Sequence, residues 1–391
     1  MKIELVNAAP AQGLVCFFVL QDGKMPSTLS PLLNGVDKKR FEGKAGQTFY
    51  AETREQKKLK QILVVGLGKK AEFKLDNLRR AAGTCVRYAA SIRSKEFTVD
   101  VSYSFGKGRG LVSEAVQAIV EGAVLASYKC TEFKSSKEDI FTVEKMHMIF
   151  DQNSNATVKT AIDRGLVFAN AQNYSRKLDE KPANILSPEA VAAEARKLAR
   201  EYDLSCTIFD KSQLVKKCMN GILAVCQGSV HEPKLIVLEY NKEKKNLPLY
   251  CVVGKGVVFD SGGINIKPSK GMYEMKYDKS GAIDVLGILK AVSELRLPIR
   301  LLGIMPMVEN MPSGNAQKPG DIIKMYNGKT IEVLDTDAEG RLILADALSY
   351  ATEHKPEYII DMATLTGAIT VALGKYAIGL FTPDDKLANV L

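Results

Sequence analysis

Short apolar runs and longer amphipathic runs alternate from residue 1 to about 150. Apolar runs of strand length lie at 13–20, 61–66 and 98–103, and helical patterns lie at 75–94 and 112–128. Strands that alternate with helices of this length are typical of an α/β domain. We therefore predict an α/β fold for the N-terminal part of the chain.

The second half repeats this alternation with more strongly apolar strands. Its predicted strands lie at 235–240, 248–253, 299–305 and 358–363, and its predicted helices lie at 282–295 and 345–352. Strands that are apolar almost throughout are covered on both faces, as in parallel sheets flanked by helices. The pattern predicts a larger C-terminal domain with a mixed, largely parallel β-sheet between helices.

A polar stretch at 151–160 separates the two halves, and a helical run follows it. Ser187 is placed to cap a helix at 188–202 whose first residue is Pro188. We predict an N-terminal α/β domain at 1–160, a linker helix and junction at 161–185, and the larger domain at 186–391.

Composition places the chain among ordinary globular proteins. The 391 residues are 46% hydrophobic and 25% charged, which suffices for two domains with buried cores. The apolar run at 13–20 lacks a basic leader and a cleavage site, so it is interpreted as a strand and not as a signal peptide. No stretch has the apolar length of a membrane-spanning helix.

Cysteine usage and charge indicate the setting. The seven cysteines form no paired spacing, which indicates buried thiols in a reducing cytoplasm. The net charge of +9 fits a nucleic-acid partner, an anionic substrate or a well-solvated surface. The last is favoured because the lysines are dispersed and are not interleaved with aromatic residues.

Two polar clusters begin where apolar strands end. The first, at 252–282, carries Lys255, Asp260, Lys267 and Asp278. The second is LDTDAEGRLIL at 334–344, with carboxylates at alternate positions, Asp335, Asp337 and Glu339, followed by Gly340 and Arg341. A strand and turn would put these carboxylates on one side. Ligands of open α/β sheets bind at the carboxyl ends of the strands, where both clusters are expected.

Carboxylates brought together repel one another unless cations neutralise them. A pair of divalent metals is the natural counter-charge, and the site would be oxygen-rich because His147, His231 and His354 show no ligand spacing. Taken singly, each motif is more often a solvated loop or a turn. Lysines and aspartates together at strand ends favour a site, since lysine can also stabilise an oxyanion.

Several segments resemble one enzyme family. VGKGVVFDSGGINIKPS, MKYDKSGA, DTDAEGRLILADAL and DMATLTGAI are similar to signature segments of the leucyl aminopeptidase family, the cytosolic M17 di-metal peptidases. KPANILSP, GILAVCQGS and PKLIVLEY resemble the family too. The likeness is specific over 180–380 and is mainly one of pattern before that.

The resemblance implies roles for the residues of both clusters. Asp260 and Glu339 would bridge two divalent ions, Mn²⁺ or Zn²⁺. Asp337 would complete one site, and Asp278 with the neutral amine of Lys255 would complete the other. The family's general base is bicarbonate.

Arg341 would hold that bicarbonate, and Lys267 would polarise the scissile carbonyl and stabilise the oxyanion. The resemblance also implies a pocket for the first side chain of the substrate, lined by Met275, Thr364, Leu365 and Gly367. Without the family, Met275 is more often core filler and the TLTG segment a helix cap.

The chain departs from the family at three points. Asp335 stands where asparagine is usual, and a carboxylate there either bonds to a ligand or faces solvent. Lys279 stands where methionine is common and puts charge beside Asp278. Family members also run on past residue 391, so the resemblance implies a catalytic domain truncated at its C-terminus.

The implied function is a metal-dependent aminopeptidase that releases an N-terminal leucine or another apolar residue from peptides. The implied assembly is a homo-hexamer in the cytoplasm, with no membrane contact. Two alternatives stay open. One is another two-metal hydrolase such as a phosphoesterase, and the other is a basic nucleic-acid-binding protein, with nucleic acid as a possible secondary partner.

Overall fold

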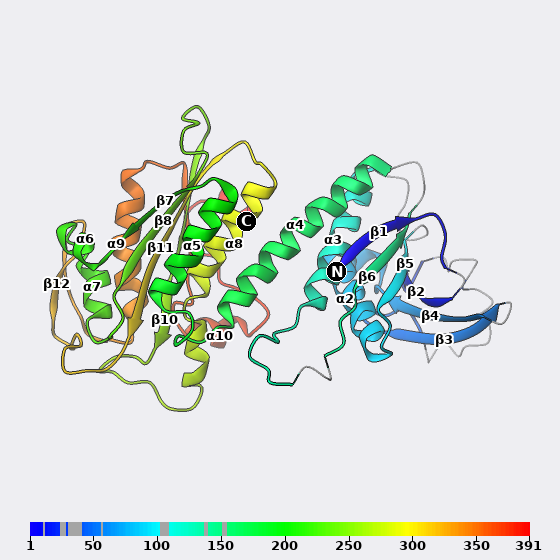
Figure 1. The fold of residues 1–391 in the computed structure, drawn as a ribbon, viewed down its shortest axis with the longest axis horizontal. Helices are drawn as coiled ribbons and strands as arrows, with labels where there is room; N and C mark the ends of the chain where they lie inside the picture. The colour runs from blue at the N-terminus through cyan, green and yellow to red at the C-terminus, as the bar shows by residue number, and fades with distance from the viewer. Residues whose placement is uncertain are drawn as a thin grey trace. The chain divides into compact units, whose positions relative to one another are not determined.

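The protein divides into two compact units. The computed structural model describes residues 1–10, 12–23, 29, 41–55, 58–101, 109–136, 140–150 and 155–391. Contacts separate Met1–Tyr174 from Ser175–Leu391, and Figure 1 shows both units. The division falls inside the helix α4 (Asn155–Asp179). The boundaries at 160 and 185 stay a prediction.

The first unit contains a six-stranded sheet in the order β1-β6-β5-β2-β4-β3. Its strands are β1 (Lys2–Val6), β2 (Gly13–Val19), β3 (Thr48–Glu55), β4 (Lys58–Gly66), β5 (Glu96–Asp100) and β6 (Lys145–Ile149). Only β3 runs antiparallel to its neighbour among the described strands of this sheet. The predicted strands at 13–20, 61–66 and 98–103 are β2, β4 and β5, and residues 102–103 lie outside the described residues.

Two helices cover this sheet, α2 (Leu75–Ser91) and α3 (Arg109–Ser127), and the short helix η1 (Lys70–Glu72) precedes them. The buried positions of α2 recur at helical spacing, so that Leu78, Cys85 and Ala89 face the core. That core also contains Leu63 of β4 and Ile119 of α3. The predicted N-terminal α/β fold is confirmed.

The second unit is built on a mixed sheet in the order β14-β9-β11-β8-β7, with β10 paired to β11. Its strands are β7 (Ser205–Phe209), β8 (Lys234–Tyr240), β9 (Leu249–Gly254), β10 (Gly256–Asp260), β11 (Arg300–Asn310) and β14 (Tyr358–Met362). Three pairings are parallel, β14 with β9, β9 with β11 and β10 with β11. The two involving β8 are antiparallel. A hairpin of β12 (Ile322–Lys324) and β13 (Thr330–Glu332) lies apart.

Helices cover both faces of this sheet (Figure 1), α5 and α8 on one face and α7 and α9 on the other. They are α5 (Pro188–Tyr202), α6 (Lys211–Lys216), α7 (Asn220–Cys226), α8 (Ser280–Glu294), α9 (Glu339–Glu353), α10 (Ala368–Leu373), α11 (Asp385–Val390) and the 3-10 helix η3 (Met272–Tyr277). Ser187 accepts the Ala190 N–H at 3.3 Å, so the predicted cap of α5 is confirmed.

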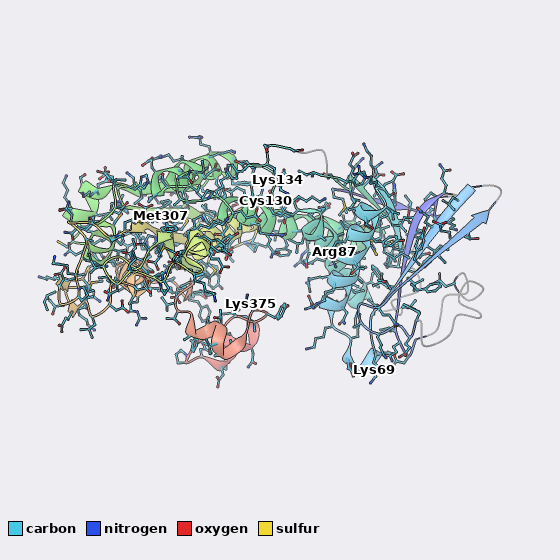
Figure 2. All side chains as sticks on the ribbon, turned by 90° about the horizontal axis from the view of Figure 1, so that it is seen from below. Lys69, Arg87, Cys130, Lys134, Met307 and Lys375 are labelled. Atoms are coloured by element: carbon cyan, nitrogen blue, oxygen red, sulfur yellow. The ribbon has the colours of Figure 1, made fainter. Side chains whose placement is uncertain are left out.

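Burial on both faces explains the apolar character of β11, whereas β14, predicted to be covered in the same way, is only partly buried. Every residue of β11 from Leu301 to Val308 is buried, including Met307, which lies within the second unit in Figure 2. The mixed, largely parallel sheet predicted from these strands is confirmed. None of the described helices is long and apolar enough to cross a membrane.

Parallel pairing brings several strand ends to one edge. β9, β10, β11 and β14 run in the same direction, so their carboxyl ends lie together. The residues at or just after those ends are Lys255, Asp260, Asn310 and Thr364. The two polar clusters of the sequence therefore meet at the edge where α/β sheets bind their ligands.

Candidate metal centre

Lys255 contacts the two carboxylates of one half of the site. Its side chain leaves the end of β9 almost fully buried, and its Nζ lies 2.7 Å from Asp278 Oδ1 and 2.8 Å from Glu339 Oε1. It also donates to the Thr364 carbonyl oxygen at 2.9 Å. Burial lowers the pKa of Lys255, but the two carboxylates outweigh burial and raise it above its ordinary value. The side chain is an ammonium that neutralises part of a buried acidic cluster.

Lys267 plays the same part in the other half. Its Nζ lies 2.8 Å from Asp260 Oδ2 and 2.5 Å from Asp337 Oδ1. Burial opposes the charged form here as well, but bonds to these carboxylates raise the pKa of Lys267. Lys267 is therefore protonated at neutral pH.

Asp278 lies at the corner between η3 and α8, and Thr364 fixes it. The Thr364 hydroxyl donates to Asp278 Oδ1 at 2.7 Å, the oxygen that also binds Lys255. The Val257 N–H donates to the Asp278 carbonyl oxygen at 3.2 Å, which ties the corner to β10. Burial raises the pKa of Asp278 despite the nearby lysine.

The acidic run at 335–339 is not the strand end that its alternation predicted. Residues 334–338 form a bend and a turn, and Glu339 is the first residue of α9. Gly340 does not turn the chain either. A Cβ at Gly340 would lie 2.7 Å from Lys255 Cε, so the missing side chain makes room for the lysine. Side-chain period two could not reveal a carboxylate that a helix start presents.

Four carboxylates therefore face two ammonium groups. Asp260, Asp337 and Glu339 each offer an oxygen, and these oxygens all lie within 4.8 Å of one another. Asp278 Oδ2 and Glu339 Oε2 are buried and have no hydrogen-bond partner. Burial raises the pKa of Glu339 to about 7, partly opposed by Lys255 and reinforced by Asp260. The two ammonium groups therefore leave the four carboxylates incompletely neutralised.

This donor set fits hard divalent cations. Unpartnered buried carboxylate oxygens are the ligands that such ions prefer, and a cation would supply the missing charge. The fit rests on oxygen donors of four residues, and the role of the Lys255 amine as a ligand stays a prediction, because the amine would first have to lose its proton.

The other predicted site residues lie at the margin of this cluster. Arg341 lies in the first turn of α9, is exposed, and forms no salt bridge among the described residues. Met275 is half-buried in η3, beside the Asp278 corner. Leu365 and Gly367 follow Thr364 and are exposed. Their predicted roles in binding stay predictions.

The two departures have different surroundings. Asp335 is exposed, and its Oδ1 accepts the Asp337 N–H at 2.9 Å, so it supports the turn that carries a candidate ligand. Lys279 is fully buried. Its ammonium donates to the carbonyl oxygens of Asp179 at 2.9 Å and of Lys181 at 3.0 Å, and also to that of Lys276. Lys279 therefore fastens the end of α4 to the corner that bears Asp278.

Sequence patterns missed three residues that hold the cluster together. Asn310, Thr336 and Asn265 form hydrogen bonds with the segments that carry the candidate ligands. Thr336 bonds to both of the other two. One signal was available, because Asn310 ends the apolar run of β11 as Asp260 ends that of β10. Thr336 and Asn265 carry no such mark in the sequence.

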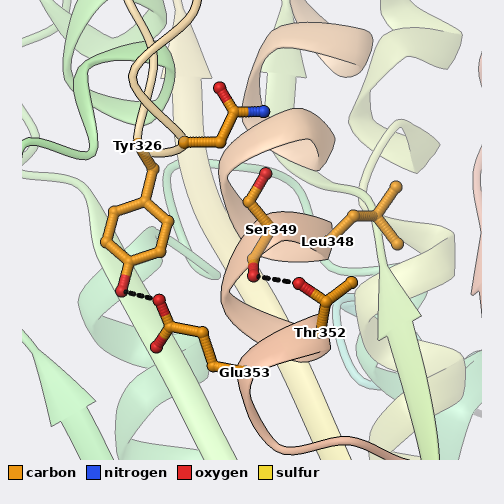
Figure 3. Close-up of a pocket in the computed structure, with 6 residues that line it drawn as sticks. Tyr326, Leu348, Ser349, Thr352 and Glu353 are labelled. Carbon is orange, nitrogen blue, oxygen red and sulfur yellow. Dashed lines mark hydrogen bonds between the residues drawn. The ribbon is translucent and has the colours of Figure 1, made fainter.

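Two hollows described in the second unit, of about 470 and 550 Å³, are lined by none of these carboxylates. A cavity of about 470 Å³ is lined by Tyr326, Asn327, Leu348, Ser349, Thr352 and Glu353 (Figure 3). The Tyr326 hydroxyl donates to Glu353 at 2.7 Å, and the Thr352 hydroxyl donates to the Ser349 carbonyl at 2.7 Å. These polar groups satisfy one another. They also lie at the end of α9 remote from Glu339, so this hollow is separate from the carboxylates.

Fold and site together define a class of protein. It is a two-unit α/β protein with an oxygen-rich, lysine-balanced acidic centre at the carboxyl ends of parallel strands. Comparison with known families identifies it further. The catalytic domain of the cytosol aminopeptidase family matches residues 173–391, and the N-terminal domain of that family matches residues 28–137. The chain belongs to the cytosol aminopeptidase family, M17, and is an aminopeptidase that acts on peptides.

Individual relatives agree. A "probable cytosol aminopeptidase" of Roseiflexus castenholzii is 41% identical over 100% of this chain and 80% of its own length. One of Aquifex aeolicus is 44% identical over 89% of this chain and 69% of its own. Among solved structures, the bottromycin maturation enzyme BotP in complex with Mn matches with a TM-score of 0.82 and 32% identity. That match covers 96% of this chain and 77% of that chain.

Lys279 provides a test of the buried ammonium. Lys279→Met keeps much of the volume but leaves three carbonyl oxygens and Asp179 without their cation. Removing a buried charge is favourable in itself, but each unpaired buried group costs about 1–3 kcal/mol, so the losses dominate. We expect the free energy of unfolding to fall by ~2–4 kcal/mol in urea titrations. Lys270→Met, at an exposed lysine, should change it little, and equal stability of both variants would contradict the assigned role.

The raised pKa of Glu339 lets us predict how the stability of the protein without added metal depends on pH. Its pKa is raised from 4.5 to about 7, so between these values the folded chain holds a proton that the unfolded chain has released. This contribution to stability is complete below pH 4.5 and is lost as pH rises through 7. Glu339→Gln cannot ionise, so its melting temperature should exceed that of the wild type increasingly between pH 5 and 8, by roughly 5 °C or more at the upper end. Parallel pH profiles in the presence of a chelator would contradict the raised pKa.

Proposed function

We propose that this aminopeptidase is metal-dependent and removes leucine or another apolar residue from the N-terminus of peptides. The observation that carries the proposal is the buried cluster of Asp260, Asp337 and Glu339, whose negative charge two lysines do not fully balance. The Mn named with the similar BotP structure supports a divalent ion. Membership in a family of aminopeptidases supports a role for this centre in peptide hydrolysis.

The residues that would hold two divalent ions, Mn²⁺ or Zn²⁺, are Lys255, Asp260, Asp278, Asp337 and Glu339. Such ions supply a water-derived nucleophile at neutral pH and polarise a carbonyl oxygen. Asp260 pairs with Lys267 and Glu339 pairs with Lys255, yet their oxygens lie within 4.8 Å of one another, so both carboxylates would take part in holding the two ions. Lys255 must lose its proton to serve as a ligand, so binding releases a proton from this side chain.

Lys267 is the group that would act on the substrate carbonyl. Its raised pKa keeps a proton on Nζ, and its side chain is only partly buried. An ammonium beside the scissile bond stabilises the negative charge that develops on the carbonyl oxygen. Lys255, with its side chain 3% exposed, cannot reach a peptide in the same way.

Arg341 is free to bind an anion. It projects from the first turn of α9, two residues from Glu339, and its guanidinium forms no salt bridge among the described residues. We propose that it holds bicarbonate as the general base. The exposed Leu365 beside Thr364, together with Met275 and Gly367, would form the apolar wall that favours leucine.

The proposed cellular location, assembly and partners rest on the cysteines, the family resemblance and the charge. Four of the seven cysteines, Cys16, Cys85, Cys226 and Cys251, are buried thiols, which suits the reducing cytoplasm, whereas Cys130 and Cys218 are exposed. A homo-hexamer is the assembly that the family resemblance implies. We propose nucleic acid only as a secondary partner, because the lysines are dispersed along the sequence and are not interleaved with aromatic residues.

The deciding measurement is hydrolysis of leucine 4-nitroanilide with added Mn²⁺ or Zn²⁺ and with a chelator. The wild type should be active with metal and inactive with chelator. Asp260→Ala should abolish activity and lower the metal content, because this carboxylate would serve both ions. Glu332→Ala removes an exposed carboxylate of β13 and serves as the control. Full activity in chelator, or undiminished metal content in Asp260→Ala, would contradict the metal assignment.

Lys267→Ala should separate metal binding from turnover. We expect kcat to fall by ~10²–10³-fold while the metal content stays unchanged, as when one oxyanion-stabilising donor is removed. Lys270→Ala, three residues further along the same exposed loop, is the matched control. A loss confined to KM would show that Lys267 binds substrate and does not stabilise the transition state.

A further inference from the structure

Asn310 lies inside the candidate metal centre but is not one of its charged groups. It is the last residue of β11 and is 1% exposed. It pairs in the sheet with Asp260, the last residue of β10, after a shift of register between Val257 and Asp260. The Asn310 side chain reaches the ligand-bearing loops, as its hydrogen bonds show.

The Asn310 amide touches two segments that carry candidate ligands. Its Nδ2 donates to Asp260 Oδ1 at 2.8 Å and to the Thr336 carbonyl oxygen at 3.1 Å. Both partners can only accept, so the NH₂ group, and not the amide oxygen, must face them. One neutral side chain therefore connects Asp260 with the residue before Asp337.

Main-chain bonds of the same residue reinforce this link. The Asn310 carbonyl oxygen accepts the Ser261 N–H at 3.0 Å and the Ser261 hydroxyl at 2.8 Å. Asn310 thus holds the loop after β10 by its backbone and Asp260 by its side chain. A Cβ at Gly263 would lie 2.9 Å from Asn310 Oδ1, so a glycine is needed where this loop passes the amide.

Thr336 extends the connection on the other side. Its hydroxyl donates to the Gly262 carbonyl oxygen at 2.7 Å and accepts the Asn265 N–H at 2.9 Å. Its own N–H donates to Asn265 Oδ1 at 3.0 Å. The turn at 334–338 and the loop after β10 are therefore latched together, and Asn310 lies where both meet β11.

We propose that Asn310 is a positioning residue that sets the metal affinity of the centre. The inference rests on the proposed metal dependence. Together with the Gly262 N–H, which donates to the same oxygen at 2.9 Å, the amide holds Asp260 Oδ1 and directs Oδ2, the oxygen that faces Lys267, toward the cation site. By holding Thr336, it fixes the distance from Asp260 to Asp337.

A neutral amide suits this task better than a charged group does. The carboxylate oxygens within 4.8 Å of one another repel, and an unrestrained Asp260 would move away from Asp337 when no cation is bound. A further lysine would restrain them but would also compete with the metal for the same charge. The amide restrains Asp260 and leaves the charge for the metal.

The test is the affinity of the intact protein for Mn²⁺, measured by isothermal titration calorimetry and by electron paramagnetic resonance of free Mn²⁺. Asn310→Ala should weaken Mn²⁺ binding by ~10–100-fold, the usual effect of removing a partner of a metal ligand. Asn220→Ala is the matched control, since its amide also donates to a main-chain carbonyl, that of Lys324 at 2.7 Å, outside the centre. It should leave the affinity unchanged, even if both variants lose stability.

Each outcome decides a different question. Unchanged Mn²⁺ affinity in folded Asn310→Ala, with normal binding by the wild type, would overturn the role of Asn310 and leave the proposed function intact. Absence of Mn²⁺ binding by the wild type would overturn both. If Asn310→Ala does not fold, a structure of the Mn²⁺-loaded wild type decides. Asn310 Nδ2 at hydrogen-bond distance from Asp260 Oδ1 supports the proposal, and an amide turned away from Asp260 refutes it.

Discussion

The repulsion among buried carboxylates is the constraint on which the rest of the site depends. Asp260, Asp278, Asp337 and Glu339 lie together, and in the described part of the chain Lys255 and Lys267 form the salt bridges to them. Such a cluster persists only if each carboxylate is restrained by a partner that it cannot leave. The lysines restrain by charge, and the neutral donors Thr364 and Asn310 restrain by hydrogen bonds. These partners leave a net negative charge at the centre, which a divalent cation would neutralise.

The sheet provides the rigid support that keeps these mutually repelling carboxylates in place. Lys255, Asp260 and Asn310 lie at or just beyond the carboxyl ends of largely buried strands, and Thr364 follows the less buried edge strand β14. A side chain at the end of a closely packed strand cannot move far from its neighbours. The packing of the whole domain therefore offsets the unfavourable repulsion among the carboxylates. Gly340 shows how close the packing is, since even a methyl group there would meet Lys255.

Sequence patterns revealed the strands and the acidic clusters because both are local. Apolar runs fixed β8, β9, β11 and β14 within a few residues, apart from the longer carboxyl end of β11, and Asp260 followed such a run. Period-two alternation failed at Asp337 and Glu339, because a turn and a helix start can present the same spacing as a strand. Asn310 and Thr336 were missed because their importance lies in partners about 25 to 75 residues away, and spacing along the chain carries no record of those contacts.

Lys255 and Lys279 show that burial alone does not decide what a lysine does. Both ammonium groups are almost inaccessible, yet their pKa values move in opposite directions. Burial lowers the pKa of Lys279 to about 8, because its closest partners are neutral carbonyl oxygens and Asp179 compensates only in part. Two ionised carboxylates reverse the effect at Lys255. A cation bound to those carboxylates would remove the cause of that raised pKa, so under the proposed metal dependence metal and proton would compete for Lys255, while Lys279 would keep its structural bonds.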